Sequence, residues 1–255
     1  MNGIILKDDA RYDHCENYLK NSGYTFDADK GSDFIIFPFK GDVNFCEYDG
    51  GFFAGLEKGT PVFTGVSNAK LAAECEKHGL EYHAMIEEKC VAEKNAVPTS
   101  EGVIAYLIAN RNETIANSRI LVIGYGICGS DLCKRLKGLD AKVYTVVRNT
   151  AKEDAARKDG IVPIYLPQLF EKTVFDVIIN TVPTRLLCNK SLHKTDNAMM
   201  IDIASSPYGF DIEYAKKLNE KSALLPGIPG KFAAKTAGEI LGEYIHRVLQ
   251  GRKRK

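Results

Sequence analysis

The stretch Gly124-Tyr-Gly-Ile-Cys-Gly129 follows the apolar run RILVI and precedes the helix-like SDLCKRLKGL. A G-x-G-x-x-G pattern is a weak signal alone, but between a strand and a helix it indicates a dinucleotide-binding βαβ unit. In such a unit Gly124 permits the tight turn, Gly126 lets a pyrophosphate approach, and Gly129 allows close helix–strand packing. The alternative is a glycine-rich turn without a ligand. We therefore predict a cofactor site made of Gly124, Tyr125, Gly126, Ile127, Cys128 and Gly129.

An arginine occupies the position that usually distinguishes the two nicotinamide dinucleotides. Arg148 comes 19 residues after Gly129, at the end of the apolar run AKVYTVV. An NAD site typically has a carboxylate there, which accepts hydrogen bonds from the ribose 2′-hydroxyl. A guanidinium instead pairs with phosphate oxygens, and Asn149, Thr150 and Lys152 add donors and one more positive charge. This turn favours NADP over NAD; the alternative is a solvated arginine at a strand end.

Repeated apolar runs predict the fold class. Near-continuous apolar runs separated by helical or loop crossovers are typical of parallel strands covered on both faces. Thr150 and Glu153 have the spacing of a capping box for the helix after Arg148, and Gly160 predicts its end. We predict an α/β fold, with a Rossmann-type doubly wound parallel sheet and a smaller N-terminal α/β domain. The runs are RILVIG, AKVYTVV, IVPIYL, FDVIINTV, AMMIDIA and SALLP, preceded by the shorter GIILKD, DFIIFPF, TPVFTGV and EYHAM.

Two longer helices are predicted near the domain boundaries. The first covers residues 97–113, with Pro98, Thr99 and Ser100 marking its start. The second lies in AAKTAGEILGEYIHRVL, whose apolar face predicts docking on the body of the protein, with a return to the first domain as one option. The predicted organisation is an N-terminal substrate-side domain (1–96), an interdomain helix (97–113), a dinucleotide-binding domain (114–231), and a C-terminal helix with a basic tail (232–255).

Composition narrows the function classes. The chain has 34 basic and 33 acidic residues, and four of the basic ones lie in the last five positions, so the body is mildly acidic. This balance argues against a nucleic-acid or membrane-surface partner. Seven cysteines without a C-x-x-C pattern predict neither a disulfide framework nor a metal site, and packing is the favoured role of Cys128 and Cys133. The apolar run at residues 3–6 is too short for a signal peptide, so a cytoplasmic location is expected.

Several further stretches occur together in this sequence. They are NAVPTSEG (95–102), NTVP (180–183), IDIASSPYGFD (201–211) and LLPGIPGKFAAKTAGEIL (224–241), with a fainter DDAR near the start. Together they resemble the family of dipicolinate synthase A subunits, the Rossmann-type component of the spore dipicolinic acid synthase. The resemblance covers most of the chain from residue 95 onward, and the PG-x-PGK…AKTAGEIL run is its most specific part.

The resemblance implies an enzyme that oxidises dihydrodipicolinate to dipicolinate during sporulation, with NADP⁺ taking the hydride. It also implies a second, flavoprotein-like subunit, the B subunit of the synthase. Two departures stand out: the first domain is shorter than usual in the family, and Ile127 replaces the basic residue that many members carry in the glycine loop.

A planar dicarboxylate calls for hydroxyl, N–H and cationic groups to hold it, and its oxidation needs a proton acceptor. Thr99, Ser100, Ser205, Ser206, Lys231 and Arg11 are the predicted substrate-binding residues. The catalytic candidates are Lys235, Asp202 and Glu101, and Thr181, Val182 and Pro183 are predicted to border the nicotinamide. Each also has a structural interpretation, since hydroxyls cap helices and turns, carboxylates organise loops, and a lysine in a first helical turn is often solvated.

Two other functions remain open. A 2-hydroxy-acid dehydrogenase has the same two-domain architecture, but it needs a histidine–carboxylate pair and an arginine for the substrate carboxylate. No arginine occurs in the sequence beside Ser205, and His193 and His246 fit surface or packing roles better. The other alternative is a non-catalytic NADP-binding scaffold or sensor subunit. Either of the helices over 97–113 and 232–249 is also long enough to form a homodimer interface.

Overall fold

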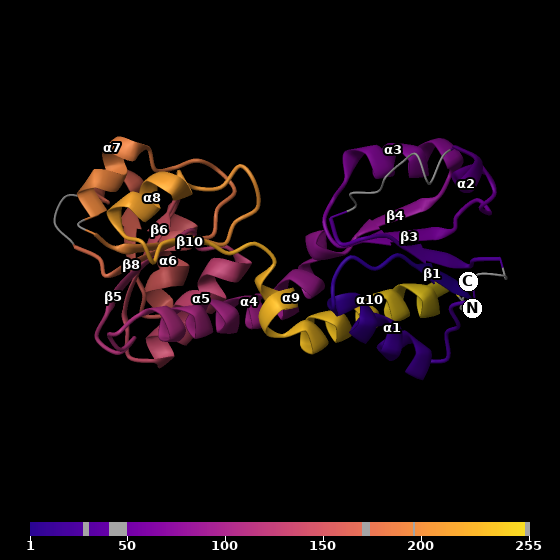
Figure 1. The fold of residues 1–255 in the computed structure, drawn as a ribbon, viewed down its shortest axis with the longest axis horizontal. Coiled ribbons are helices and arrows are strands. Elements are labelled where there is room, and N and C mark those ends of the chain that lie inside the picture. The colour runs from indigo at the N-terminus through magenta and orange to yellow at the C-terminus, as the bar shows by residue number, and fades with distance from the viewer. Residues whose placement is uncertain (28–30, 41–49, 170–173, 196, 253–255) are drawn as a thin grey trace. The chain divides into compact units, whose positions relative to one another are not determined.

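The computed structural model describes residues 1–27, 31–40, 50–169, 174–195 and 197–252. The chain divides into two compact units, each with its own sheet (Figure 1). Unit 1 comprises Met1–Asn95 and Ala233–Lys255, and unit 2 comprises Ala96–Phe232. The C-terminal helix therefore belongs to the same unit as the N-terminus. From the sequence, this return of the last helix to the first domain was one of the options.

Unit 1 contains a four-stranded parallel sheet in the order β1-β2-β3-β4. Alternating side chains of β2 pack on opposite faces: Phe34 and Ile36 lie in the core beneath α1 and α10, whereas Ile35 packs with α2 and α3 (Figure 1). The elements are β1 (Gly3–Ile5), α1 (Arg11–Asn21), β2 (Phe34–Ile36), α2 (Gly50–Ala54), β3 (Pro61–Thr64), α3 (Ala69–His78), β4 (Glu81–Ala84), η1 (Met85–Glu87) and α10 (Ala234–Arg252). All four apolar runs of the first domain form the predicted strands.

Glycines in α10 explain the most specific part of the sequence resemblance. A Cβ on Gly238, within AKTAGEIL, would overlap the backbone oxygen of Arg11, and one on Gly242 would come 2.8 Å from the ring of Tyr18. The two helices α1 and α10 therefore pack with their backbones close together, which buries Leu241 and Ile245 of α10. The AKTAGEIL part of the resemblance therefore has a packing role.

Unit 2 contains a six-stranded parallel sheet in the order β10-β9-β8-β5-β6-β7. This is the doubly wound order, in which successive strands are added on one side of β5 and then, from β8 onward, on its other side. The elements are β5 (Arg119–Ile123), α5 (Ile127–Gly138), β6 (Lys142–Val147), α6 (Thr150–Lys158), β7 (Val162–Tyr165), η2 (Leu166–Gln168), β8 (Val177–Asn180), α7 (Asn189–Leu192), η3 (His193–Thr195), β9 (Met199–Asp202), α8 (Ile212–Leu218), β10 (Ala223–Leu224) and α9 (Ile228–Phe232). All six predicted strands and the Rossmann-type fold are confirmed.

Two separate cores cover the faces of this sheet, as expected of parallel strands. One core joins the strands to the second half of α4 (Lys89–Asn110) and to α5 and α6, and the other joins them to α7 and α8. The strands are consequently buried on both sides: every residue of β8 and β9 is inaccessible or nearly so. A rigid sheet of this kind fixes the loops at its carboxyl edge.

Two predicted helix starts were wrong. The helix predicted from residue 97 begins at Lys89, so Pro98 lies inside α4, where it removes one backbone hydrogen bond but does not end the helix. Thr99 and Ser100 are therefore interior helix residues, without the free N–H groups of a helix start. The cap of α6 is also shifted: the side chain of Asn149, not Thr150, accepts from Lys152 N at 3.0 Å. Gly160 follows the end of α6 with φ +71°, as predicted.

Within the described ranges, no helix combines the length and the apolar character that a membrane span requires. In the same ranges, no group of three or more His, Cys, Asp or Glu side chains is arranged to hold a metal ion.

A largely buried histidine makes the stability of unit 1 depend on pH. His83 of β4 stacks on Phe63 at 4.9 Å between ring centroids, and its Nδ1 lies 3.3 Å from the hydroxyl of Tyr244. Burial lowers the pKa of His83 by more than the negative charges of Glu81 and Glu88 raise it. The unfolded chain therefore binds a proton on His83 at a higher pH than the folded chain does, so stability is lost as the pH falls below about 6.5.

We expect His83→Gln to reduce this loss. One proton can contribute at most about 1.4 kcal/mol per pH unit to the free energy of unfolding. Denaturant titrations between neutral and mildly acidic pH should show a shallower decline for the variant than for the wild-type protein. Parallel declines in the two proteins would show that His83 does not carry the dependence.

Candidate functional site

The glycine loop after β5 has the geometry of a dinucleotide-binding turn. Gly124 has φ +102°, and a Cβ there would lie 2.6 Å from Cγ2 of Val182 and 2.8 Å from Oγ1 of Thr181. A Cβ on Gly129 would overlap the carbonyl oxygen of Gly124, well inside the 3.0 Å that real Cβ atoms keep. The tight turn predicted at Gly124 and the close packing predicted at Gly129 are thus confirmed.

Gly126 and the start of α5 leave room for a ligand. Among the described residues, apart from the chain neighbours of Gly126, no atom lies within 4 Å of the position that a Cβ on Gly126 would occupy. No side chain in the described part of the chain caps α5, so the first N–H groups of the helix, from Ile127 onward, have no capping acceptor there. Uncapped N–H groups at a helix start attract anions. The residues present therefore fit a pyrophosphate, although the contacts of Gly126 and Ile127 with it stay a prediction.

The side chains of Tyr125 and Cys128 belong to the packing around the loop. Tyr125 is 6% exposed and donates a 2.6 Å hydrogen bond to Asp159, which also forms an ion pair with Lys134. Burial, and then the hydrogen bond to Asp159, raise the pKa of Tyr125. Burial raises the pKa of the Cys128 thiol to about 12, so a thiolate is disfavoured. Only their backbones remain candidates for cofactor contact, and packing accounts for both side chains.

The turn between β6 and α6 presents cations that pair with none of the described residues. Arg148, Asn149, Thr150 and Lys152 are all exposed. Neither Arg148 nor Lys152 forms an ion pair with any residue that the structure describes, whereas Arg157 of the same helix pairs with Glu153. The side-chain oxygen of Asn149 is occupied by its cap. Arg148 and Lys152 are thus the charged groups here that are available to an anion.

The segment after β8 lies against the glycine loop. Oγ1 of Thr181 donates to the carbonyl of Ile123 at 2.9 Å, and the backbone N–H of Thr181 donates to the same oxygen. Together with the close approach of Val182 to Gly124, this places Thr181–Pro183 next to the predicted cofactor turn. Pro183 itself is exposed.

A buried polar pair joins the loops that follow β8 and β9. Asp202 is 1% exposed and accepts hydrogen bonds from Asn180 Nδ2 at 2.9 Å, Ala204 N at 3.0 Å and Gly209 N at 2.6 Å. Asn180 also donates to Val182 O at 2.9 Å and accepts from Val182 N at 3.2 Å. Both oxygens of Asp202 are therefore engaged, which favours a loop-organising role over the predicted role as a base. Asn180 was missed, although it ends an apolar strand just as Asp202 does.

Two other predicted site residues are engaged in local contacts. Glu101 forms an ion pair with Arg135 at 3.3 Å, and its side chain is 59% exposed. Arg11 pairs with Asp9 and stacks on Phe39, with the guanidinium carbon 3.5 Å from the ring centroid. Burial alone would raise the pKa of Asp9, but the hydrogen bond and charge of Arg11 outweigh it, and the pKa is lowered. Arg11 would have to break these contacts to bind a substrate.

The remaining predicted residues fall into three settings. Ser205 and Ser206 are exposed in the loop after β9, where the Ser206–Pro207 peptide bond is cis. Ser100 of α4 is fully buried, and its hydroxyl has no hydrogen-bond partner in the part of the chain that is described. Thr99 is its neighbour in α4, Lys231 is exposed in α9 of unit 2, and Lys235 is exposed in the first turn of α10 in unit 1.

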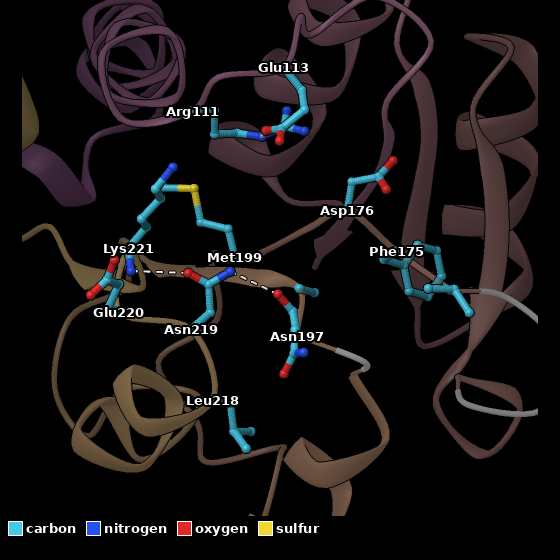
Figure 2. A pocket seen from close by; sticks show the side chains of 12 residues that line it. Arg111, Glu113, Phe175, Asp176, Asn197, Met199, Leu218, Asn219, Glu220 and Lys221 are labelled. Carbon is cyan, nitrogen blue, oxygen red and sulfur yellow. Dashed lines mark hydrogen bonds and ion pairs between the residues drawn. The ribbon is translucent and has the colours of Figure 1, made fainter.

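A hollow of about 520 Å³ lies at the opposite, amino edge of the sheet in unit 2 (Figure 2). It is lined by residues that precede or begin strands, such as Asp176 and Met199, and by Asn219, whose side chain bonds Asn197 O and Lys221 N. Arg111 faces Glu113 there at 3.6 Å. None of the predicted site residues lines this hollow, so the carboxyl edge remains the candidate site.

Comparisons with known proteins agree with this geometry. No protein-family model matches the chain. The A subunit of dipicolinate synthase from Bacillus subtilis (strain 168) is 33% identical over 190 residues, which span 74% of this chain and 64% of that protein. The crystal structure of the dipicolinate synthase A chain from B. subtilis has a TM-score of 0.90 at 25% identity, covering 99% of this chain and 96% of that one.

Two further structures are similar. The dipicolinate synthase A subunit from Bacillus halodurans has a TM-score of 0.88 at 26% identity, covering 97% of both chains. D-lactate dehydrogenase with NAD⁺ from Lactobacillus jensenii has a TM-score of 0.60 at 12% identity, covering 98% of this chain and 96% of that one. The latter likeness concerns the fold alone. The sequence resemblance to dipicolinate synthase A subunits is confirmed.

Proposed function

The chain is a homologue of the dipicolinate synthase A subunit, and we propose that it oxidises dihydrodipicolinate to dipicolinate with NADP⁺ as the hydride acceptor. The observation that carries this proposal is the glycine loop at the carboxyl edge of unit 2, followed by a helix start that no described side chain caps and by Arg148, which pairs with no described residue. Parallel α/β sheets bind their ligands at this edge, beside the strand at which the strand order reverses, which is β5 here. We place the activity in the cytoplasm of a sporulating cell.

In this proposal unit 2 holds the cofactor along its carboxyl edge. The N–H groups at the start of α5 bind the pyrophosphate, and Arg148 with Lys152 binds the 2′-phosphate. Thr181–Pro183 border the nicotinamide, because they contact the glycine loop. Bound NADP⁺ would supply the acceptor for one hydride, and one proton would leave the substrate as its ring becomes aromatic.

Binding the dicarboxylate requires hydrogen-bond donors and cations that are not already held by other residues of the protein. Ser205, Ser206, Lys231 and Lys235 are exposed and meet this requirement, whereas Arg11 is held by Asp9. Of the three predicted catalytic residues, Lys235 is the one that this proposal keeps, since Asp202 and Glu101 are both engaged. Its ammonium form can bind a carboxylate, and only its neutral amine form can accept the proton. A moderate base suffices, because aromatisation supplies much of the driving force. The buried hydroxyl of Ser100, with Thr99 beside it, is the remaining candidate donor.

A second candidate is favoured by the same contacts. Two of the three predicted bases already have partners within unit 2. A chain with few free catalytic groups suits either a shared active site, completed by the second, flavoprotein-like subunit, or a non-catalytic NADP-binding scaffold. The relative from B. subtilis is named as one subunit of a synthase, which is compatible with both.

An assay on the purified chain tests the proposal. The protein is mixed with NADP⁺ and freshly generated dihydrodipicolinate, and the absorbance of reduced cofactor and of dipicolinate is followed. Turnover by the chain alone supports the full proposal. Turnover only after addition of the second subunit places the chemistry in a shared site, and no turnover in either mixture favours the scaffold.

A further inference from the structure

We propose that Arg185 binds a carboxylate of the substrate, together with the hydroxyls of Ser205 and Ser206. This inference rests on the proposed function and names the cation that its dicarboxylate site would use. Arg185 lies in the segment between β8 and α7 and is exposed. Its guanidinium makes no hydrogen bond or ion pair with any residue in the described ranges.

Backbone hydrogen bonds bring Arg185 next to the serine loop. The carbonyl of Gly209 accepts from Leu186 N at 2.9 Å and from Leu187 N at 3.0 Å. The peptide group that follows Arg185 is therefore bonded directly to the loop that contains both serines. Within that loop Tyr208 N donates to Ser205 O at 3.1 Å, which closes a turn. The sequence places Arg185 and Ser205 twenty residues apart, but the sheet brings their loops together.

Asn180 and Asp202 hold this arrangement. Asp202 binds the backbone of Ala204 and Gly209 on one loop, while Asn180 binds the backbone of Val182 on the other, and the two side chains bond each other. A Cβ on Gly209 would overlap the side chain of Asn180, so the contact requires glycine there. Asn180 and Asp202 are thus positioning residues that fix the carboxylate site next to Thr181 and Val182.

The local chemistry suits an anion. A guanidinium presents a planar pair of donors that matches a carboxylate, and serine hydroxyls add single donors. The nearby carboxylate of Asp202 is buried and saturated by three donors, and the carboxylate of Asp211 caps α8 by accepting from Tyr214 N. Arg185 therefore has no acidic partner from either loop. An exposed arginine alone would be unremarkable; its position beside the predicted nicotinamide is what singles it out.

Ligand binding tests Arg185 without depending on turnover. The NADP⁺-loaded protein is titrated calorimetrically with pyridine-2,6-dicarboxylate and, separately, with pyridine-2-carboxylate. Arg185→Gln should weaken binding of the dicarboxylate by about 10- to 100-fold and reduce the preference over the monocarboxylate. Arg185→Lys should recover part of the affinity, because it keeps the charge but not the planar fork.

Lys190→Gln is the matched control, because it removes an exposed cation from α7, the helix that follows the segment of Arg185. The affinity of this variant should equal that of the wild type. Equal losses in the two glutamine variants would indicate a general effect of charge and would overturn the inference, as would unchanged binding by Arg185→Gln. A wild-type protein that neither binds the dicarboxylate nor oxidises dihydrodipicolinate would overturn the proposed function, and this inference with it.

Asp202→Asn tests the positioning role, because the amide cannot accept from Gly209 N at the replaced oxygen. Hydrogen–deuterium exchange should become faster in both segments 182–187 and 203–210, and the KM for dihydrodipicolinate should rise while its pH profile keeps its shape. Asp176→Asn is the control, since Asp176 accepts from Arg119 N at 2.6 Å at the other edge of the sheet. Faster exchange in only one of the two segments, or a displaced pH profile, would overturn the positioning role.

Discussion

Gly129→Ala is expected to weaken NADP⁺ binding by about 10- to 100-fold and to destabilise unit 2 by about 1–3 kcal/mol. The added Cβ would overlap the carbonyl oxygen of Gly124 and come 3.1 Å from Oγ1 of Thr181. Backbone cannot yield as a flexible side chain does, so α5 must move away from β5. That movement displaces the N–H groups that are proposed to bind the pyrophosphate. Cofactor affinity by calorimetry and thermal unfolding of the same samples measure both effects.

Gly138→Ala is a matched control in the same helix. Gly138 is the last residue of α5, and outside its own helix no described atom lies within 4 Å of the Cβ that alanine would add there. Alanine also has the higher helix propensity, so stability should stay the same or rise. Cofactor affinity should not change. If Gly129→Ala bound NADP⁺ as tightly as Gly138→Ala does, the glycine loop would not be the phosphate site.

Arg148→Asp is expected to reverse the cofactor preference. The substitution removes the guanidinium proposed to pair with the 2′-phosphate and introduces a carboxylate that repels it. A charged hydrogen bond of this kind contributes about 1.5–3 kcal/mol, so affinity for NADP⁺ should fall by about 10- to 100-fold. The same carboxylate can accept hydrogen bonds from a ribose 2′-hydroxyl, so affinity for NAD⁺ relative to NADP⁺ should rise. Parallel titrations with the two cofactors give the ratio.

Lys158→Asp makes the same change in charge at the far end of α6, where Lys158 is exposed. This variant controls for the effect of net charge on cofactor binding. Its ratio of NADP⁺ affinity to NAD⁺ affinity should match that of the wild type within about 2-fold. An unchanged ratio in Arg148→Asp would remove this residue from the account of specificity. The glycine loop would then bind a dinucleotide without distinguishing the phosphate.

The architecture was largely predictable because it follows from local patterns. Short apolar runs became the strands of both sheets, and the glycine pattern after RILVI fixed the turn at Gly124 and the packing at Gly129. Helix starts were less predictable. Pro98 is a helix-start signal in most sequences, but α4 accommodates it in its interior, and Asn149 competes with Thr150 as a cap at the adjacent position. The error at α6 arises because two neighbouring residues satisfy the same capping rule, and the error at α4 arises because a proline that marks many helix starts lies here in a helix interior.

The candidate site was only partly predictable because its contacts are not local. That Asp202 is saturated depends on Asn180 and Gly209, which lie on other segments and meet it only in the folded sheet. Arg11 looked available because its stacking on Phe39, which is distant in the sequence, exists only in the fold; its ion-pair partner Asp9 lies two positions away. Arg185 was overlooked for the converse reason: nothing in NTVPTRLL shows that the next residue bonds the loop that contains Ser205 and Ser206. The sequence signal that points to the site is the presence of polar residues, such as Asn180 and Asp202, at the ends of apolar strands.

A crystal structure of the protein with NADP⁺ tests the central claim most directly. The account predicts pyrophosphate oxygens at the N–H groups that begin α5, facing Gly126, with the 2′-phosphate beside Arg148 and the nicotinamide beside Thr181–Pro183. A glycine loop that remains empty at saturating NADP⁺, or a nucleotide bound at another place such as the hollow at the amino edge, would contradict it.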